Sequence, residues 1–73
     1  MNKYILDDKK EYYIFMEKSI DSNRYILFSE VNNPSNICFR KEVINKDRIK
    51  GFIPLGSEDE FNKITLEFLK DII

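Results

Sequence analysis

The first 53 residues alternate between short apolar runs and polar turns, and this alternation restricts the chain to a strand-rich fold. The runs are rich in aromatic and β-branched side chains, which favour the pleated surface of a β-sheet. Polar residues break the runs, as in Asp21-Ser22-Asn23, and a proline does so at Pro34. We predict strands within about residues 3–6, 11–18, 24–31, 37–44 and 49–53. Connections this short join antiparallel strands, because parallel neighbours need a long crossover.

One helix is predicted over residues 58–72. Ser57 precedes it, and Glu60 three residues later completes a capping box, in which each side chain bonds to the backbone amide of the other residue. An apolar stripe follows at helical spacing: Phe61, Ile64, Phe68 and Ile72. We expect this stripe to pack on the sheet. The chain is therefore predicted to be a single α+β domain, residues 1–73, with a three- to five-stranded antiparallel meander and one C-terminal helix packed on one face.

The apolar side chains of the central strands exceed what one helix can cover. Tyr12, Ile14 and Met16 should share one face of their strand, because side chains alternate. Two interpretations stay open. The sheet can curl on itself with cover from the N-terminal segment, or an aromatic face can be exposed to a partner. For the second interpretation the expected contacts are Tyr13, Phe15 and Phe28.

The predicted helix carries a second apolar line beside its core stripe. Leu66, Leu69 and Ile73 recur at helical spacing on a neighbouring face. Leu69 can lie at the margin of the core, whereas Leu66 and Ile73 should be exposed. We therefore expect Leu66 and Ile73 to form a helix edge that contacts a partner.

Charge is balanced overall but unevenly placed. The chain has 12 basic and 13 acidic side chains, a net charge of -1, and five of the basic ones lie in residues 40–50. Four of these are expected to contact an acidic partner: Arg40, Lys41, Arg48 and Lys50.

Direct binding of nucleic acid is disfavoured, because the chain is not basic and the predicted helix begins with three acids. A nucleic-acid-binding sheet stays open as an alternative, with bases stacked on Tyr12, Tyr13, Tyr25, Phe28 and Phe39.

The chain has no histidine and one cysteine, Cys38, which removes most catalytic chemistry. Hydrolytic triads and Cys-His dyads need an imidazole, and a zinc site of Cys and His ligands needs more than one thiolate. Gly51 and Gly56 stand alone, so no phosphate-binding loop is predicted. The acids of residues 58–60 are explained by the start of the helix. We predict no enzyme, no metal site and no cofactor. The rival class is a redox protein that uses Cys38, with Arg40 nearby to lower its pKa.

Residues 11–20, EYYIFMEKSI, and residues 23–30, NRYILFSE, resemble the short YrzB-like family of Gram-positive bacteria, whose members have a strand ending in Leu-Glu, a short turn and then Tyr-Leu-Leu-Val. Residues 53–61, IPLGSEDEF, with FLKD at 68–71, are similar to its acidic helix start and closing helix. The resemblance covers about residues 8–73 and implies no activity, because the family has no established function or catalytic residues. The basic residues 40–50 depart from the family, which is acidic in its third strand.

These observations predict a non-enzymatic protein-binding module of the cytoplasm. A lone cysteine is typical of intracellular proteins, and the first residues lack an apolar stretch that could direct secretion or span a membrane. The expected partner is another protein, and a homodimer stays open. One alternative is an inhibitor encoded by a phage or mobile element, which blocks a host defence nuclease or nucleoprotein complex. The other is the nucleic-acid-binding sheet.

Overall fold

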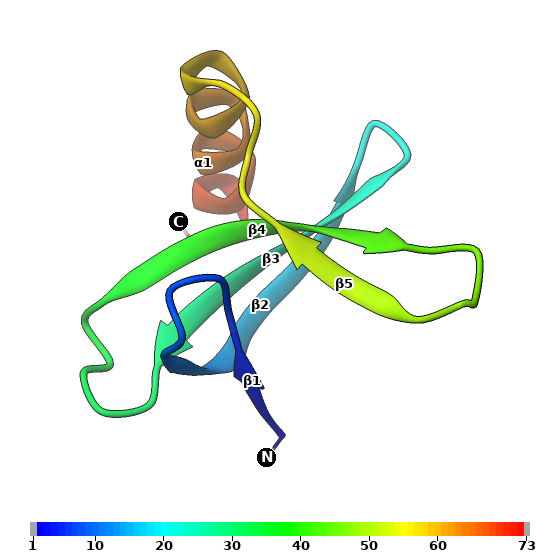
Figure 1. The fold of residues 1–73 in the computed structure, drawn as a ribbon. Helices are drawn as coiled ribbons and strands as arrows, with labels where there is room; N and C mark the ends of the chain where they lie inside the picture. Colours follow the sequence, from blue (N-terminus) through cyan, green and yellow to red (C-terminus); the bar gives the residue numbers. More distant parts are fainter. Residues whose placement is uncertain (1, 73) are drawn as a thin grey trace.

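The protein folds as one five-stranded antiparallel sheet followed by one helix (Figure 1). The structure is a computed structural model that describes residues 2–72 of the chain. Its elements are β1 (Lys3–Ile5), β2 (Glu11–Ile20), β3 (Asn23–Glu30), β4 (Ile37–Ile44), β5 (Lys50–Ile53) and α1 (Glu58–Ile72). The strands lie in the order β1-β2-β3-β4-β5, so each pairs with its neighbour in the chain. This arrangement confirms the predicted α+β meander with a single C-terminal helix.

The longest hairpin joins β2 to β3 through a two-residue turn. Asp21 and Ser22 occupy the turn with φ angles of 51° and 69°. Two successive positive φ angles are typical of the tight turn whose twist matches that of the flanking strands. The turn lets β2 continue to Ile20 and lets β3 begin at Asn23, the residue that pairs with it.

The sheet curls strongly, and its concave side encloses a group of buried side chains that we call the inner cluster. Its buried members are Leu6, Tyr12, Ile26 and Phe28. The curl brings the two edge strands together, because the rings of Tyr4 on β1 and Phe52 on β5 lie 5.4 Å apart. Both rings also contact Phe28, at 6.0 and 5.1 Å. Curling with cover from the N-terminal segment is therefore the interpretation that the structure supports, and most of the sheet's aromatic side chains are used internally.

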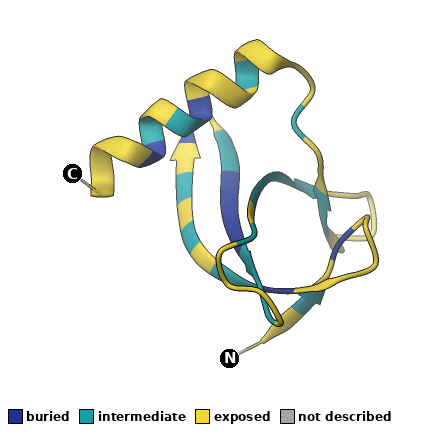
Figure 2. Cartoon of the chain, turned by 90° about the vertical axis from the view of Figure 1, so that its left-hand side faces the viewer, coloured by how far each residue is buried: buried dark blue, intermediate teal, exposed yellow. Residues whose placement is uncertain are grey.

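The helix covers the opposite, convex side of the sheet and completes a second group, the outer cluster. The buried residues of this group are Ile20, Tyr25, Leu27, Ile64 and Phe68. In Figure 2 the helix is buried only where it passes over the strands. Of the predicted core stripe, Ile64 and Phe68 are buried, whereas Phe61 and Ile72 near the two helix ends are exposed. The expectation that this stripe is buried on the sheet is thus met in the middle of the helix only: Phe61 contacts Phe39 on β4 but stays 46% exposed, and Ile72 is 57% exposed.

The start of the helix is tied to the sheet through Glu60. The Ser57 hydroxyl accepts a hydrogen bond from the Glu60 amide at 3.1 Å, as the capping box predicts. The Glu60 carboxylate, however, reaches past Ser57 and accepts from the Gly56 amide at 2.7 Å. Its other oxygen accepts from the Tyr25 hydroxyl on β3, also at 2.7 Å. One carboxylate therefore joins the helix start to the central strand.

A β-bulge in β2 reverses which face its side chains occupy. Ile14 pairs with Phe28 and Met16 pairs with Leu27, so Phe15 is an extra residue without a partner on β3. Before the bulge, Ile14 packs on the inner cluster, and after it, Met16 packs on the outer cluster. The expectation that Tyr12, Ile14 and Met16 share one face is wrong for Met16 for this reason.

The carboxylate of Glu60 should make stability depend on pH on the acid side. The hydrogen bonds from the Gly56 amide and then the Tyr25 hydroxyl hold the pKa of Glu60 below its usual value of 4.5. A carboxyl group whose pKa is lower in the folded chain stabilises the fold above its unfolded pKa. That stabilisation is lost as the pH falls through the folded value. Glu60→Gln is therefore expected to lower the free energy of unfolding most at neutral pH.

Urea denaturation at a series of pH values measures this effect. The difference between the parent and Glu60→Gln should shrink as the pH falls below about 4.5, the unfolded pKa. Glu58→Gln is the matched control, because Glu58 lies in the same first turn of α1 but belongs only to the acidic helix start. Its effect should be smaller at neutral pH. A Glu60→Gln difference that is constant down to pH 3 would contradict the prediction.

Candidate functional site

The sheet aromatics expected to contact a partner are divided between the surface and the core. Phe15 is 64% exposed at the bulge, and Tyr13 is half-buried. Phe28 is 0% exposed, because it is the ring around which Tyr4, Tyr12 and Phe52 pack. The expected contact at Phe28 is therefore wrong. The alternative of a base-stacking sheet also loses three of its five rings, because Tyr12, Tyr25 and Phe28 are all buried.

The basic segment does not form one patch. Arg40 and Lys41 are neighbours on β4, so their side chains point to opposite faces of the sheet. The Arg40 guanidinium pairs with Asp7 at 2.9 Å on the concave side. The Lys41 ammonium lies 3.9 Å from the Glu60 carboxylate on the helix side.

The other two expected contacts of the basic segment lie at the far end of β4 and β5. The Lys50 ammonium lies 3.9 Å from the Glu42 carboxylate. Arg48 is exposed in the β4–β5 turn, where its φ is 62°. The structure thus distributes these cations over two faces and a turn, and pairs three of the four with carboxylates.

The expected helix edge is described only in part. Leu66 is 62% exposed and borders a shallow hollow formed by one side of the helix. Its neighbours there include the charged side chains of Lys63, Glu67 and Lys70. Ile73 lies outside the described residues. Leu69 also lines this hollow, so Leu66 has one apolar neighbour there and is otherwise surrounded by charged side chains.

An apolar groove of about 250 Å³ lies between α1 and β4, and it is the most coherent binding feature of the described chain. Its lining residues are Leu27, Ile37, Cys38, Phe39, Phe61, Thr65, Phe68, Leu69 and Ile72. None of them is charged. The floor is packed, since the Phe39 ring contacts the rings of Phe61 and Phe68 at 5.8 and 5.1 Å. The rim is open, because Ile37, Phe61, Leu69 and Ile72 are exposed.

The rim residues were not predicted as contacts from the sequence. Phe61 and Ile72 belong to the predicted core stripe, and Leu69 was placed at the core margin. A signal was nevertheless present, since the helix has more apolar positions than one packed face can bury. Ile37 had no such signal, because its exposure depends on where the helix lies across the sheet.

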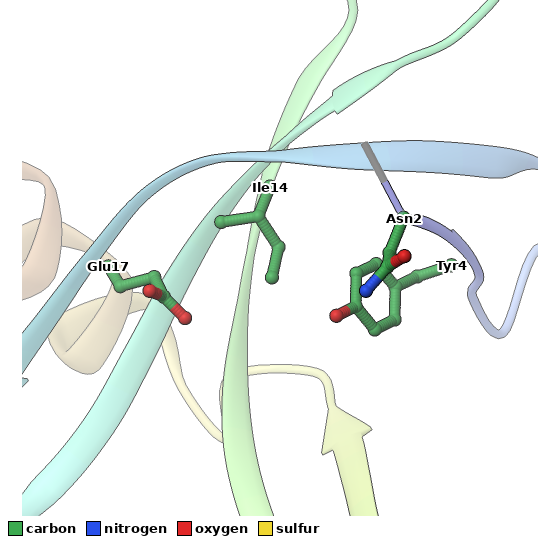
Figure 3. A pocket seen from close by; sticks show the side chains of 4 residues that line it. All are labelled: Asn2, Tyr4, Ile14 and Glu17. Carbon is green, nitrogen blue, oxygen red and sulfur yellow. The ribbon is translucent and has the colours of Figure 1, made fainter.

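Another hollow on the surface has fewer features of a binding site than the groove. It is about 260 Å³ in volume and is bordered by Asn2, Tyr4, Ile14 and Glu17 (Figure 3). Its carboxylate is already neutralised, because Glu17 pairs with Arg24 at 2.9 Å. In Figure 3 the side chains of Tyr4 and Glu17 lie on opposite sides of Ile14, so no set of polar groups converges there.

Two titratable groups of the inner cluster and its border have raised pKa values. Burial raises the pKa of the Cys38 thiol, and the nearby Arg40 charge offsets this only in part. The thiolate needed for redox chemistry is thus disfavoured, which weakens the redox alternative. The hydrogen bond to Asp8, then burial, raise the pKa of Tyr12, whose hydroxyl ties the β1–β2 turn to β2.

Residues 2–72 contain no cluster of three or more side chains suited to holding a metal ion. Within the same residues, α1 is too short and too polar to cross a bilayer. Comparisons with protein-family models, curated proteins and solved structures found no match. The resemblance to the YrzB-like family therefore stays a prediction.

Proposed function

We propose that this chain is a non-enzymatic protein-binding module whose contact surface is the groove between α1 and β4. The observation that carries the proposal is the groove's rim, where Ile37, Phe61, Leu69 and Ile72 are exposed together around an uncharged hollow. Exposed apolar patches that are contiguous mark contact sites in small proteins, whereas single exposed apolar residues do not.

The chemistry of the groove favours a macromolecular partner over a substrate. Its lining contains a thiol and a hydroxyl as its only polar side chains, from Cys38 and Thr65. The Thr65 hydroxyl is already used, since it donates to the Phe61 carbonyl at 2.8 Å within the helix. A binding surface can be almost wholly apolar at its centre, whereas catalysis needs positioned acids, bases or nucleophiles. An inhibitor that blocks a nuclease would be one instance of such a module.

The proposal predicts that one exposed helix position controls binding and another of equal exposure does not. Ile72 lines the groove and is 57% exposed, whereas Leu66 lies outside it and is 62% exposed. Ile72→Asp places a charge in the groove that binding would have to desolvate. Leu66→Asp places the same charge among the solvated side chains of the helix surface, so it serves as the matched control.

The measurement is affinity capture from lysate of the source organism or its host, with and without nuclease treatment, followed by quantitative mass spectrometry. For a protein captured by the parent and by Leu66→Asp, the captured amount should fall about tenfold with Ile72→Asp. Desolvating the new charge is expected to cost about 1.4 kcal/mol or more, which corresponds to that factor. Circular dichroism should show all three proteins folded. Equal capture by both variants would refute the groove as the contact surface. Capture that disappears with nuclease would instead support the nucleic-acid alternative.

A further inference from the structure

The first half of β4 has a strand partner on one side only. β5 pairs with residues 41–44 of β4, beginning at the pair Lys41 and Ile53. Pro54 follows at once, and the chain leaves the sheet toward the helix (Figure 1). Residues 37–40 therefore pair with β3 and with no other strand of residues 2–72. The sheet has an open edge at this point.

The hydrogen-bond pattern shows which backbone groups face that open edge. The Glu30 amide donates to the Asn36 carbonyl at 3.0 Å, so Asn36 directs its backbone groups toward β3. At the other end, the Asn45 amide donates to the Ile49 carbonyl at 3.1 Å, so Asn45 directs its groups toward the β5 side. Because the direction alternates along a strand, Cys38 also faces β3, whereas Ile37 and Phe39 face the open edge.

Three backbone groups at this edge have no strand to bond within residues 2–72. They are the amide and the carbonyl of Ile37 and the amide of Phe39. The Phe39 carbonyl is already engaged, since it accepts from the Arg40 guanidinium at 2.8 Å. An edge with unpaired donors and acceptors is a template for another extended chain.

The open edge borders the apolar groove. Ile37, Cys38 and Phe39 are consecutive, and all three line the groove. The Cys38 side chain packs on the inner cluster, on the opposite face of the sheet. Three consecutive strand residues can line one hollow only where the hollow reaches the backbone at the edge of the strand. The unpaired backbone groups and the apolar surface are therefore parts of one site.

We propose that this site takes a short extended segment of a partner protein, which adds as a strand to the edge of β4 and places alternate apolar side chains in the groove. The inference rests on the proposed function and specifies its binding mode. The backbone of such a segment satisfies the amides of Ile37 and Phe39, and its apolar side chains contact the rim at Leu69 and Ile72.

Other occupants fit less well. An acyl chain could fill an apolar groove of about 250 Å³, but its ionised carboxylate has no donor for the Ile37 carbonyl and cannot pair along the edge as a backbone does. A second copy of the chain would need more surface, since a stable interface buries roughly 800 Å² on each partner and the rim offers four part-exposed side chains. Charge complementarity favours an uncharged segment, because no lining residue is charged.

The probe is a displayed library of random peptides of about seven residues, long enough to pair with the open edge, selected on the parent protein and depleted on Ile72→Asp. The expected result is enrichment of sequences with apolar side chains at every second position. A selected peptide is then synthesised with N-methyl groups on alternate residues. Methylation of the set that faces β4 should weaken binding about tenfold for each bond lost, whereas methylation of the other set should not.

Amide hydrogen exchange locates the peptide on the protein. The amides of Ile37 and Phe39 should exchange fast in the free protein and slow by at least about tenfold when the selected peptide is bound. The Cys38 amide, which faces β3, should be slow in both states and is the internal control. Selection of peptides without the period of two, selection of none, or equal effects of the two methylation sets would overturn the proposal.

Two further outcomes assign the edge to another occupant and also overturn the proposal. Light scattering that gives twice the 8.8 kDa chain mass, with Ile37 and Phe39 slow before any peptide is added, would assign it to a second copy. If the parent binds added dodecanoate but no peptide, and Ile72→Asp loses the dodecanoate, the groove would be assigned to an acyl chain. A lysate protein could be captured by the parent and not by Ile72→Asp, yet leave the amides of Ile37 and Phe39 exchanging fast when it is bound to the parent. That result would support the proposed function and refute strand addition.

Discussion

Replacing Phe28 with alanine is expected to destabilise this protein more than any exposed aromatic substitution. The ring is fully buried and contacts the rings of Tyr4, Tyr12 and Phe52. Its removal leaves a cavity in the middle of the inner cluster, at a cost of about 3–5 kcal/mol. A chain of 73 residues has a total stability of about 4–11 kcal/mol. One substitution therefore removes a large share of it.

Urea denaturation followed by circular dichroism measures the Phe28→Ala effect. Phe15→Ala is the matched control, because the same atoms are removed from a ring that is 64% exposed at the bulge. The control should change the free energy of unfolding by no more than about 0.5 kcal/mol. If the two substitutions had similar effects, the inner cluster would not be the packed core that the curl of the sheet creates.

Replacing Phe68 with alanine is expected to detach the helix. The helix buries only two residues, Ile64 and Phe68, and the Phe68 ring lies 5.1 Å from that of Phe39. The substitution should cost about 3–5 kcal/mol, the usual effect of removing a buried ring. A helix of 15 residues is marginal in water without tertiary contacts, so α1 should lose its structure when its anchor is removed.

Amide exchange distinguishes this effect from the loss of the inner cluster. In Phe68→Ala the amides of α1 should exchange through a local opening, at a lower free energy than the amides of β3, and the helical signal at 222 nm should fall. Leu66→Ala is the control, since Leu66 is exposed on the same helix, and its effect should stay within about 0.5 kcal/mol. Equal protection of α1 and β3 in Phe68→Ala would show that the helix does not depend on this contact.

The candidate site was only partly visible in the sequence. The exposure of Phe15 and Leu66 agrees with the expected positions, although Phe15 is exposed as the extra residue of the bulge and Leu66 because it lies on the outer side of the helix. Phe28 could not be placed correctly, since its burial depends on β1 and β5 meeting over it. The cations at Arg40 and Lys41 looked like one patch in sequence but are separated by the alternation of a strand.

Part of the open edge of β4 could be predicted from the sequence. The predicted strand at 49–53 is shorter than the one at 37–44, so part of the longer strand had to lack a partner on that side. The sequence did not indicate that an apolar groove would border this edge. That depends on the path of residues 54–57, which carry the chain from β5 to the start of the helix above β4.

The sequence by itself determined the elements of this protein and their pairing. Local chemistry is sufficient for that: branched and aromatic runs favour strands, short polar breaks impose antiparallel neighbours, and Ser57 with Glu60 starts a helix. The tertiary structure alone decided the curl of the sheet, the bulge at Phe15 and the groove beside the open edge. These features arise because twist accumulates over five strands, and because side chains far apart in the chain compete for the same enclosed space.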